Sequence, residues 1–241
     1  LWIVRNPQAA LPGVGEHLHD HPDVVLLYDA PHLKDLFGVS AEAAVRIARG
    51  VMEWRRARTG MLTTNYAEAG GFIRSSAAES APDLQLHFVI GKLVDHGRKT
   101  ALGHGYSSHV CLLQPRSRGR VALASADPMA LPLVDPNFLA DEDDLQRMVR
   151  GVRRMRAILS QPALADLGGK ELPVSASAQT DAEIAQFIRS HATTPWAAAA
   201  WALGPWTWWM RSCACMVCRG CGWWTPPSCP ASPAATPTPP R

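Results

Sequence analysis

Four side chains near the N-terminus are of the types that bind metal ions. They are His17, His19, Asp20 and His21. Imidazole and carboxylate groups are common zinc ligands, so this cluster is a candidate metal site. Dense histidine runs are, however, more often loop residues in contact with solvent. The sequence therefore favours a loop without a metal ion.

The glycines beside this cluster superficially suggest a phosphate-binding turn. A dinucleotide fingerprint requires a third glycine and a helix directly after the turn. Gly13-x-Gly15 has neither, because His19-Asp20-His21-Pro22 interrupts the segment. We do not expect this turn to hold a phosphate.

Two further side chains are candidates for contact with a substrate. Glu68 stands before Gly70 and Gly71, which allow another group to approach the backbone closely. A carboxylate there is either an exposed residue beside a glycine bend or a group that faces a substrate cavity. His87 lies in an alternating segment and faces solvent or an active-site cavity; a structural histidine is the commoner case.

Five of the six cysteines fall in the last part of the chain, where they suggest a second metal site. Cys215, Cys218 and Cys221 follow the spacing of a zinc knuckle, with Cys213 and Cys229 nearby. A non-catalytic metal-binding module is therefore one hypothesis for the function. No residue of the chain is assigned as a metal ligand.

Periodic patterns predict the elements that position these side chains. Strands are expected at residues 24–28, 84–90 and 107–114, and a return strand at 121–125 is expected to form a hairpin with the last of these. Helices are expected at residues 40–56, at 141–159 and after Thr180, which opens a capping box with Glu183. The fold class that follows is α+β, an antiparallel sheet with flanking helices.

The two longer helices differ in the surface that the pattern gives them. The helix at residues 40–56 has an apolar face of Ala, Val and Met and a charged face that should be solvated. The helix at 141–159 begins after Asp141 and should bury one face in the core. That face consists of Leu145, Met148, Val149, Val152, Met155, Ile158 and Leu159.

Composition excludes several classes of protein. The net charge of +3 on 241 residues is modest and the basic residues are scattered, so no nucleic-acid surface is indicated. No apolar run reaches the ~18 residues of a membrane span. Outside the tail Cys111 is the single cysteine, which suits a reducing compartment and predicts a cytoplasmic location. The chain begins with Leu1, and we expect it to be a fragment.

Five segments, in order along the chain, resemble motifs of the glucose–methanol–choline (GMC) family of flavin oxidoreductases, and most closely its choline and alcohol dehydrogenase branch. The segments are Leu11–His21, Tyr66–Ser75, Gln114–Gly119, Ser125–Pro128 and Asp135–Leu139. Each motif is short, but their shared order makes the set specific. The resemblance covers residues 11 to about 190.

The resemblance implies a cofactor, a substrate and a set of binding residues. The cofactor is FAD, and Gly15, Asp20 and His21 belong to a loop that packs against the flavin in the family. The substrate is a small alcohol, oxidised to an aldehyde while hydride passes to FAD. Glu68 would lie near a cationic substrate, and His87 is the second candidate for substrate binding. At His17 the family usually has Asn.

From Thr193 onward the composition departs from that of the family. Residues 193–241 contain no Asp, Glu, Lys or His but hold seven of the nine Trp and nine of the twenty Pro. If each codon begins one nucleotide upstream, the codons of this stretch become compatible with family motifs, among them Tyr-His-Pro-Val-Gly and Asn-Thr-Asn-Ala-Pro-Thr. The preferred interpretation is a frameshift rather than a metal site.

These observations lead to one prediction for the whole chain. Residues 1–35 are a remnant of the FAD-binding domain, 36–192 are the substrate-binding domain, and 193–241 are a frameshifted, disordered tail. In the family the His of His-Pro-Val-Gly takes the alcohol proton. As written, the chain lacks that His and the nucleotide-binding fold, so no catalytic residue is assigned. The fragment is expected to be inactive and not to bind FAD.

Overall fold

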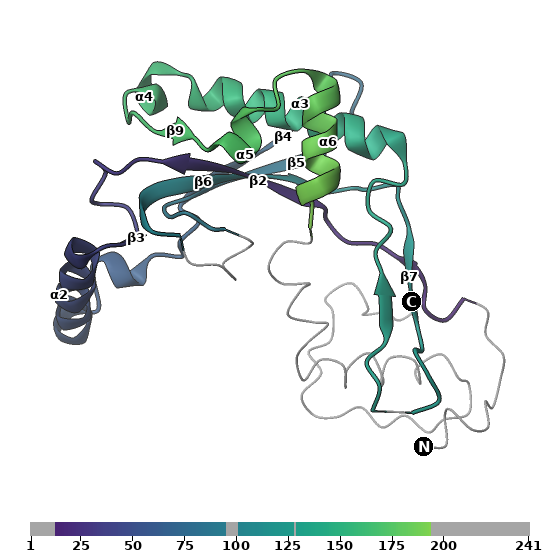
Figure 1. Ribbon diagram of the computed structural model, residues 1–241, viewed down its shortest axis with the longest axis horizontal. Coiled ribbons are helices and arrows are strands. Elements are labelled where there is room, and N and C mark those ends of the chain that lie inside the picture. Colours follow the sequence, from purple (N-terminus) through teal and green to yellow (C-terminus); the bar gives the residue numbers. More distant parts are fainter. Residues whose placement is uncertain (1–12, 95–100, 128, 194–241) are drawn as a thin grey trace, which may run out of the picture.

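The computed structural model describes residues 13–94, 101–127 and 129–193 (Figure 1). Its centre is a six-stranded sheet with β4-β5-β6-β2-β9 in order and β3 paired to β6, and every pairing is antiparallel. The predictions for the tail at 194–241 and for residues 1–12 lie outside the described residues. The strands of the large sheet are β2 (Asp23–Asp29), β3 (Gly38–Val39), β4 (Ala69–Ile73), β5 (Leu84–Val89), β6 (Gly103–Leu112) and β9 (Lys170–Glu171).

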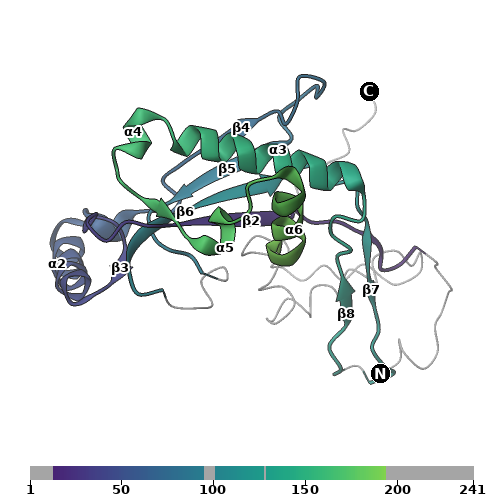
Figure 2. The same ribbon diagram turned by 45° about the horizontal axis from the view of Figure 1, so that its top comes forward.

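Helices cover one face of this sheet. Figures 1 and 2 show α3 (Glu142–Leu159) and α6 (Asp181–His191) together on that face, with the short helices α4 (Pro162–Ala165) and α5 (Pro173–Ala176) beside them. The α+β prediction, an antiparallel sheet with flanking helices, is therefore confirmed. β2 belongs to this same sheet although its residues precede position 36.

The core lies between the sheet and α3. Side chains on a strand alternate between its two faces, and on β5 and β6 the residues Leu84, Leu86, Val110 and Leu112 point into the core. The predicted apolar face of α3 belongs to this cluster except for Ile158, which is partly buried and packs against it. The predicted strands at 24–28 and 84–90 correspond to β2 and β5.

Val152 lies at the centre of this core and is completely buried. Val152→Asp is expected to lower the free energy of unfolding by about 3 kcal/mol, because it buries a carboxylate with no partner. Urea denaturation measures the change. Arg154→Asp on the exposed face of the same helix is the control and should change the free energy of unfolding by less than about 0.5 kcal/mol. Equal effects of both substitutions would show that this face is not in the core.

The two predicted capping signals are confirmed. The Asp141 side chain accepts a hydrogen bond from the backbone of Asp143, 2.9 Å away, at the start of α3. At α6, Thr180 and Glu183 form both hydrogen bonds of the capping box. Beyond α6 the chain reaches Thr193, which forms an antiparallel bridge with Asp23.

The predicted hairpin is wrong. β6 extends back to Gly103 and pairs with β5 and β2, whereas β7 (Gly119–Ala122) belongs to a separate three-stranded sheet. The other strands of that sheet are β1 (Glu16–Leu18) and β8 (Leu133–Asp135). The physical reason lies in the connecting turn, where the carboxylate of Asp144 accepts the backbone N–H groups of Arg116 and Ser117. The strand after this turn leads away from β6.

The predicted helix at residues 40–56 is confirmed as α2 (Ala41–Ala57), capped by the hydroxyl of Ser40. It ends at Arg58, which adopts the left-handed conformation with φ 58°. α2 packs mainly on β3 and on the 3-10 helix η1 (Met61–Thr63). In both ribbon views it lies at one end of the molecule, away from α3 and α6 (Figure 2).

Candidate active site

The face of the large sheet opposite α3 and α6, here called the back face, holds a group of polar side chains from three neighbouring strands. β2 contributes Asp23, β5 contributes His87, and β6 contributes His109 and Cys111. These positions alternate with the core residues of the same strands, which fixes their orientation.

Burial raises the pKa of the Cys111 thiol to about 12, and the nearby Asp23 and Asp20 carboxylates add to the shift, so the thiol stays protonated near neutral pH.

Asp23 and His109 form a buried pair on the back face. Their side chains are 3% and 8% exposed, and Nδ1 of His109 lies 2.7 Å from Oδ2 of Asp23. An ionised carboxylate can only accept, so Nδ1 of the imidazole donates this hydrogen bond. The contact fixes the orientation of the ring.

His87 lies directly opposite His109 in the β5–β6 register. Their rings meet edge to face, with centroids 6.1 Å apart and an interplanar angle of 85°. Burial lowers the pKa of His87 below its ordinary value; the Asp23 carboxylate acts to raise it and His109 to lower it further. His87 is therefore a half-buried, neutral imidazole near neutral pH and can accept or donate a hydrogen bond.

Thr193 brings the C-terminal end of the described chain to the edge of the back face. Its backbone exchanges two hydrogen bonds with Asp23, of 2.8 and 3.0 Å. The segment where the composition changes thus begins beside the Asp23–His109 pair. This proximity of residues 23, 109 and 193 could not be read from their spacing in the sequence.

Among the proposed cofactor-binding residues, Gly15 has a clear structural requirement. Its φ of +86° is accessible mainly to glycine, and a Cβ there would lie 2.1 Å from the carbonyl oxygen of Val121. His17 also has positive φ, 60°. Asn, the usual family residue at this position, and His both adopt this conformation more readily than most residues. A strand, β1, follows this turn, so the turn does not present the helix N-terminus of a pyrophosphate site.

Asp20 and His21 border a pocket of about 390 Å³. Asp20 accepts the backbone N–H of His21 at 2.8 Å, and Nδ1 of His21 lies 3.0 Å from the carbonyl oxygen of Leu112. Imidazole, amide and guanidinium groups in its wall suit a polar edge of a flavin nucleotide. The pocket is lined by His19, Asp20, His21, Leu113, Gln114, Pro115 and Arg118.

Glu68 directly precedes β4, whose Gly70 pairs with His87 in the register, so the fold brings Glu68 near the strand that carries His87. The side chain of Glu68 accepts a hydrogen bond from the hydroxyl of Thr64. A Cβ at residue 70 would lie 2.4 Å from the carbonyl oxygen of Leu86, so the predicted close approach holds there; at Gly71 the space is open. Within the described residues no hydrogen bond or ion pair joins Glu68 to His87.

Of the two candidate metal sites, one lies within the described residues and the other outside them. In the described residues, no group of three or more His, Cys, Asp or Glu side chains could hold a metal ion, so the His17–His21 segment is not such a cluster. The tail cysteines lie outside the described residues.

No helix in residues 13–94, 101–127 and 129–193 is long and apolar enough to cross a bilayer.

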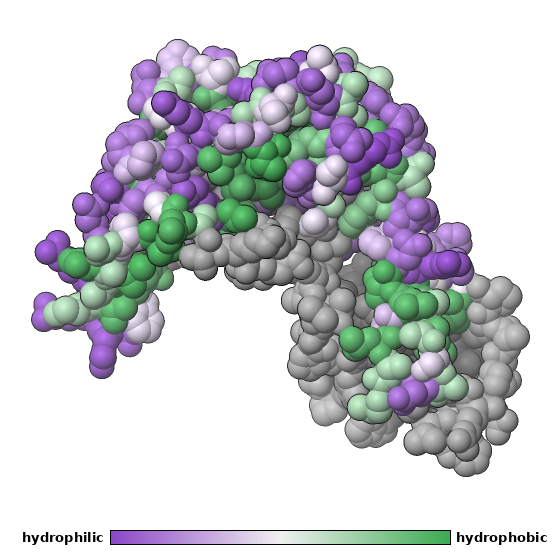
Figure 3. All heavy atoms as spheres, in the orientation of Figure 1, coloured by the Kyte–Doolittle hydropathy of each residue, from purple (hydrophilic) through white to green (hydrophobic). Residues whose placement is uncertain are grey.

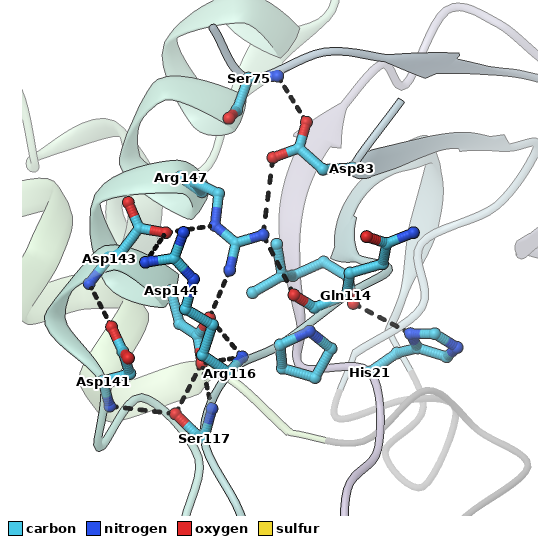
Figure 4. A network of polar contacts seen from close by, with 12 residues as sticks. His21, Ser75, Asp83, Gln114, Arg116, Ser117, Asp141, Asp143, Asp144 and Arg147 are labelled. Carbon is cyan, nitrogen blue, oxygen red and sulfur yellow. Dashed lines mark hydrogen bonds and ion pairs between the residues drawn. The ribbon is translucent and has the colours of Figure 1, made fainter. Parts of the chain in front are cut away.

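Sequence reasoning missed a buried ionic network that supports the pocket wall (Figure 4). At its centre Arg147, 3% exposed, donates hydrogen bonds to Asp144 at 2.6 Å and to the backbone carbonyl of Gln114 at 3.1 Å. It also forms ion pairs with Asp143 at 3.0 Å and Asp83 at 3.7 Å. The signal for it was the acidic first turn of α3 followed three and four residues later by Arg.

Asp144 connects this network to the turn that precedes β7. Burial acts to raise the pKa of Asp144, but the Ser117 hydroxyl, the backbone N–H groups of Arg116 and Ser117 and the charge of Arg147 together hold it below its ordinary value. The carboxylate therefore stays ionised and fixes residues 115–118 against α3. This turn in turn places Gln114 and Arg118 in the pocket wall.

The sequence has many relatives among characterised proteins. Residues 115–200 match the family described as GMC oxidoreductase. The chain is 42% identical over 184 residues to an alcohol dehydrogenase [acceptor] of Pseudomonas putida, 76% of this chain and 33% of the relative. It is 38% identical over 182 residues to the mitochondrial choline dehydrogenase of Mus musculus, 76% of this chain and 30% of that protein.

The chain belongs to the GMC oxidoreductase family. It spans about a third of the length of the curated relatives it matches. Among solved structures, a formate oxidase of Aspergillus oryzae superposes with a TM-score of 0.64 at 23% identity, over 75% of this chain and 36% of that one. An FAD-dependent oxidoreductase of Chaetomium thermophilum superposes with a TM-score of 0.62 at 21% identity, covering 78% and 38%. These structures share the fold of the sheet and helices described above.

Proposed function

We propose that this chain is the substrate-binding part of an FAD-dependent GMC oxidoreductase that oxidises the CH–OH group of a small alcohol. The observation that carries the proposal is the back face, where the neutral His87 stands next to the Asp23–His109 pair. A neutral imidazole can hydrogen-bond an alcohol hydroxyl, and its neighbouring pair holds the surrounding geometry. The names of the relatives support an alcohol or choline as the substrate.

We further propose how the chain is divided. Residues 36–192 together with β2 form the substrate-binding unit, and the segment before β2 belongs to the flavin-binding part. The tail from 193 is a frameshifted sequence, and a fragment with this tail is inactive. We also propose a cytoplasmic location, because the chain outside the tail has a single, buried cysteine.

The residues present fit one edge of FAD. Arg118, Gln114 and His21 at the pocket would hold a polar part of the flavin nucleotide, with Gly15 and Asp20 shaping the loop beside them. The pyrophosphate has no such cradle among the described residues. When bound, FAD supplies the hydride acceptor. The task of this chain is to orient the alcohol, exclude water and hold its hydroxyl at His87.

A chimera tests this function. Residues 13–193 would replace the matching segment of the Pseudomonas putida alcohol dehydrogenase, whose remaining sequence stays unchanged. The chimera is expected to bind FAD and to reduce a dye in the presence of an alcohol. A folded, flavin-bound chimera without alcohol-dependent dye reduction would contradict the proposal.

The charge of the Asp23 carboxylate is expected to influence the pKa of His87. Asp23→Asn removes the charge that favours the imidazolium, so the pKa of His87 is expected to fall further below its ordinary value. NMR titration of the 241-residue chain measures it. Asp29→Asn on the same strand is the control, because Asp29 pairs with Lys92 at 2.7 Å, and it should leave His87 unchanged. An unchanged pKa of His87 in Asp23→Asn would show that the two groups are not coupled.

Glu68 is proposed to select cationic alcohols. In the chimera, Glu68→Gln should lower kcat/KM for choline about fivefold and leave that for a neutral alcohol of similar size unchanged, because only the cation gains from the carboxylate. Glu53→Gln is a matched control, since Glu53 is likewise exposed and bonded to a threonine hydroxyl, that of Thr59. Equal losses for choline and the neutral alcohol would leave Glu68 a structural residue.

A further inference from the structure

We propose that α2 docks this protein on the surface of an anionic phospholipid bilayer. Unlike α3, α2 does not bury its apolar side in the protein. Only Ala43 and Gly50 of its 17 residues are buried. Figure 3 shows apolar surface over the region of α2, at the end of the molecule away from the other long helices.

The exposed apolar residues of α2 spread over about half of the helix circumference, from Val45 and Met52 at one edge to Trp54 at the other. Val45 is 52% exposed and Met52, seven residues later and therefore on the same side, is 54% exposed. Val51 at 40% and Trp54 at 41% widen this surface toward η1, where Leu62 is 36% exposed. Aliphatic side chains with a tryptophan at the boundary are typical of helices that lie in a membrane interface.

The charges of α2 are segregated in the way that an anionic surface requires. Its two acids, Glu42 and Glu53, are eleven residues apart and so share one stripe, about 80° of rotation away from the Val45–Met52 side. Both are engaged within the protein, Glu42 with Lys34 at 2.9 Å and Glu53 with the Thr59 hydroxyl. The apolar side itself carries no acid.

Arginines border the apolar side. Arg49 and Arg56 lie along one edge of it, Arg55 lies within it, and all three are exposed. No ion pair of these three is present in the described part of the chain, whereas Arg46, on the polar stripe, pairs with Asp35. Long arginine side chains can cover apolar surface with their stems while the guanidinium reaches phosphate. Apolar side chains bordered by unpaired cations match a lipid bilayer with phosphate headgroups better than the apolar face of a second protein.

Vesicle co-sedimentation of the 241-residue chain tests the proposal. Vesicles of phosphatidylcholine with about one third phosphatidylglycerol should bind the protein, and the binding should weaken at about 0.5 M salt, where charges are screened. Vesicles of phosphatidylcholine alone should bind it much less. Equal binding to both kinds of vesicle would overturn the proposal.

Two variants identify α2 as the docking element. Val45→Glu should lower the partition coefficient about tenfold, the value of one buried valine. The double variant Arg55→Glu, Arg56→Glu should lower it at least 25-fold, about fivefold for each arginine. The matched control is Val174→Glu, at a valine that is 47% exposed on α5, and it should change nothing.

The comparison between variants is decisive because the tail, with its seven tryptophans, is the same in all of them. If Val45→Glu and Val174→Glu bind the anionic vesicles equally, α2 is not the docking element. Sedimentation velocity tests the alternative that a second copy of the chain packs on the exposed surface of α2. If the wild type is a dimer that Val45→Glu converts to monomer while vesicle binding stays unchanged, the surface is a dimer contact and the proposal is overturned.

Discussion

A chimera that carries residues 194–241 as written is expected to reduce dye with alcohol about 10²- to 10⁴-fold more slowly than the same chimera with this tail read in the shifted frame. In both proteins the first part comes from the Pseudomonas putida alcohol dehydrogenase and residues 13–193 come from this chain. The two differ only in the reading frame after Thr193. The comparison therefore isolates the residues that the frame specifies.

The expected difference has a chemical and a structural reason. Removing a proton from an alcohol near neutral pH requires a positioned base. In the shifted frame the codons after Thr193 are compatible with His-Pro-Val-Gly, whereas the written frame has no histidine after His191. Thr193 is paired with Asp23, at the edge of the face that carries His109 and His87. A histidine encoded directly after this point would join the proposed substrate site.

Replacement of that restored histidine by alanine is the control and should return the rate to that of the written frame. Flavin absorbance should be the same in all three proteins, so that a loss of cofactor is distinguished from a loss of the base. Equal rates with the two tails would contradict the frameshift interpretation.

Arg147→Met is expected to lower the free energy of unfolding by about 3–5 kcal/mol. The substitution leaves the carboxylates of Asp83 and Asp144, 2% and 0% exposed, without their guanidinium partner. Urea denaturation of the 241-residue chain measures the loss. Arg153→Met is the control, because Arg153 forms an exposed pair with Asp181 and such pairs contribute about 0–1 kcal/mol. Similar losses in both variants would show that the buried network does not stabilise the fold.

The same network predicts a dependence of stability on pH. The pKa of Asp144 is lower in the folded protein than in the unfolded chain. Its contribution is therefore fully present above the unfolded pKa of about 3.9 and is lost as the pH falls from there through the folded pKa. Asp144→Asn should make the free energy of unfolding less dependent on pH in this acid range. An unchanged pH dependence would mean that other carboxylates account for the acid sensitivity.

The sequence predicted those elements whose pattern is local. The alternation in β5, the apolar face of α3 and the capping box at Thr180 each depend on residues a few positions apart, and the structure has all three. The pairing of β7 could not be predicted in the same way. The Asp144 carboxylate, from a distant helix, determines the direction of the chain before this strand.

The candidate site shows the same limit. His87 was singled out from its strand pattern, but its neighbours Asp23 and His109 are 64 and 22 residues away in the chain, and only the strand order β5-β6-β2 brings them together. The amphipathic pattern at residues 40–56 correctly predicted the helix α2. Periodicity alone could not tell that its apolar side is exposed while that of α3 is buried, because both helices have the same kind of pattern.

The central claim is that the alcohol substrate binds at the back face of the large sheet, with its hydroxyl at His87. The most direct measurement is the rate at which an alcohol reduces the flavin of the chimera under anaerobic conditions, with and without His87→Ala. The account predicts that His87→Ala slows flavin reduction by at least about tenfold, whereas Gln186→Ala, at an exposed position of α6 on the opposite side of the sheet, leaves it unchanged. Equal rates of flavin reduction in the parent chimera and in His87→Ala would contradict it.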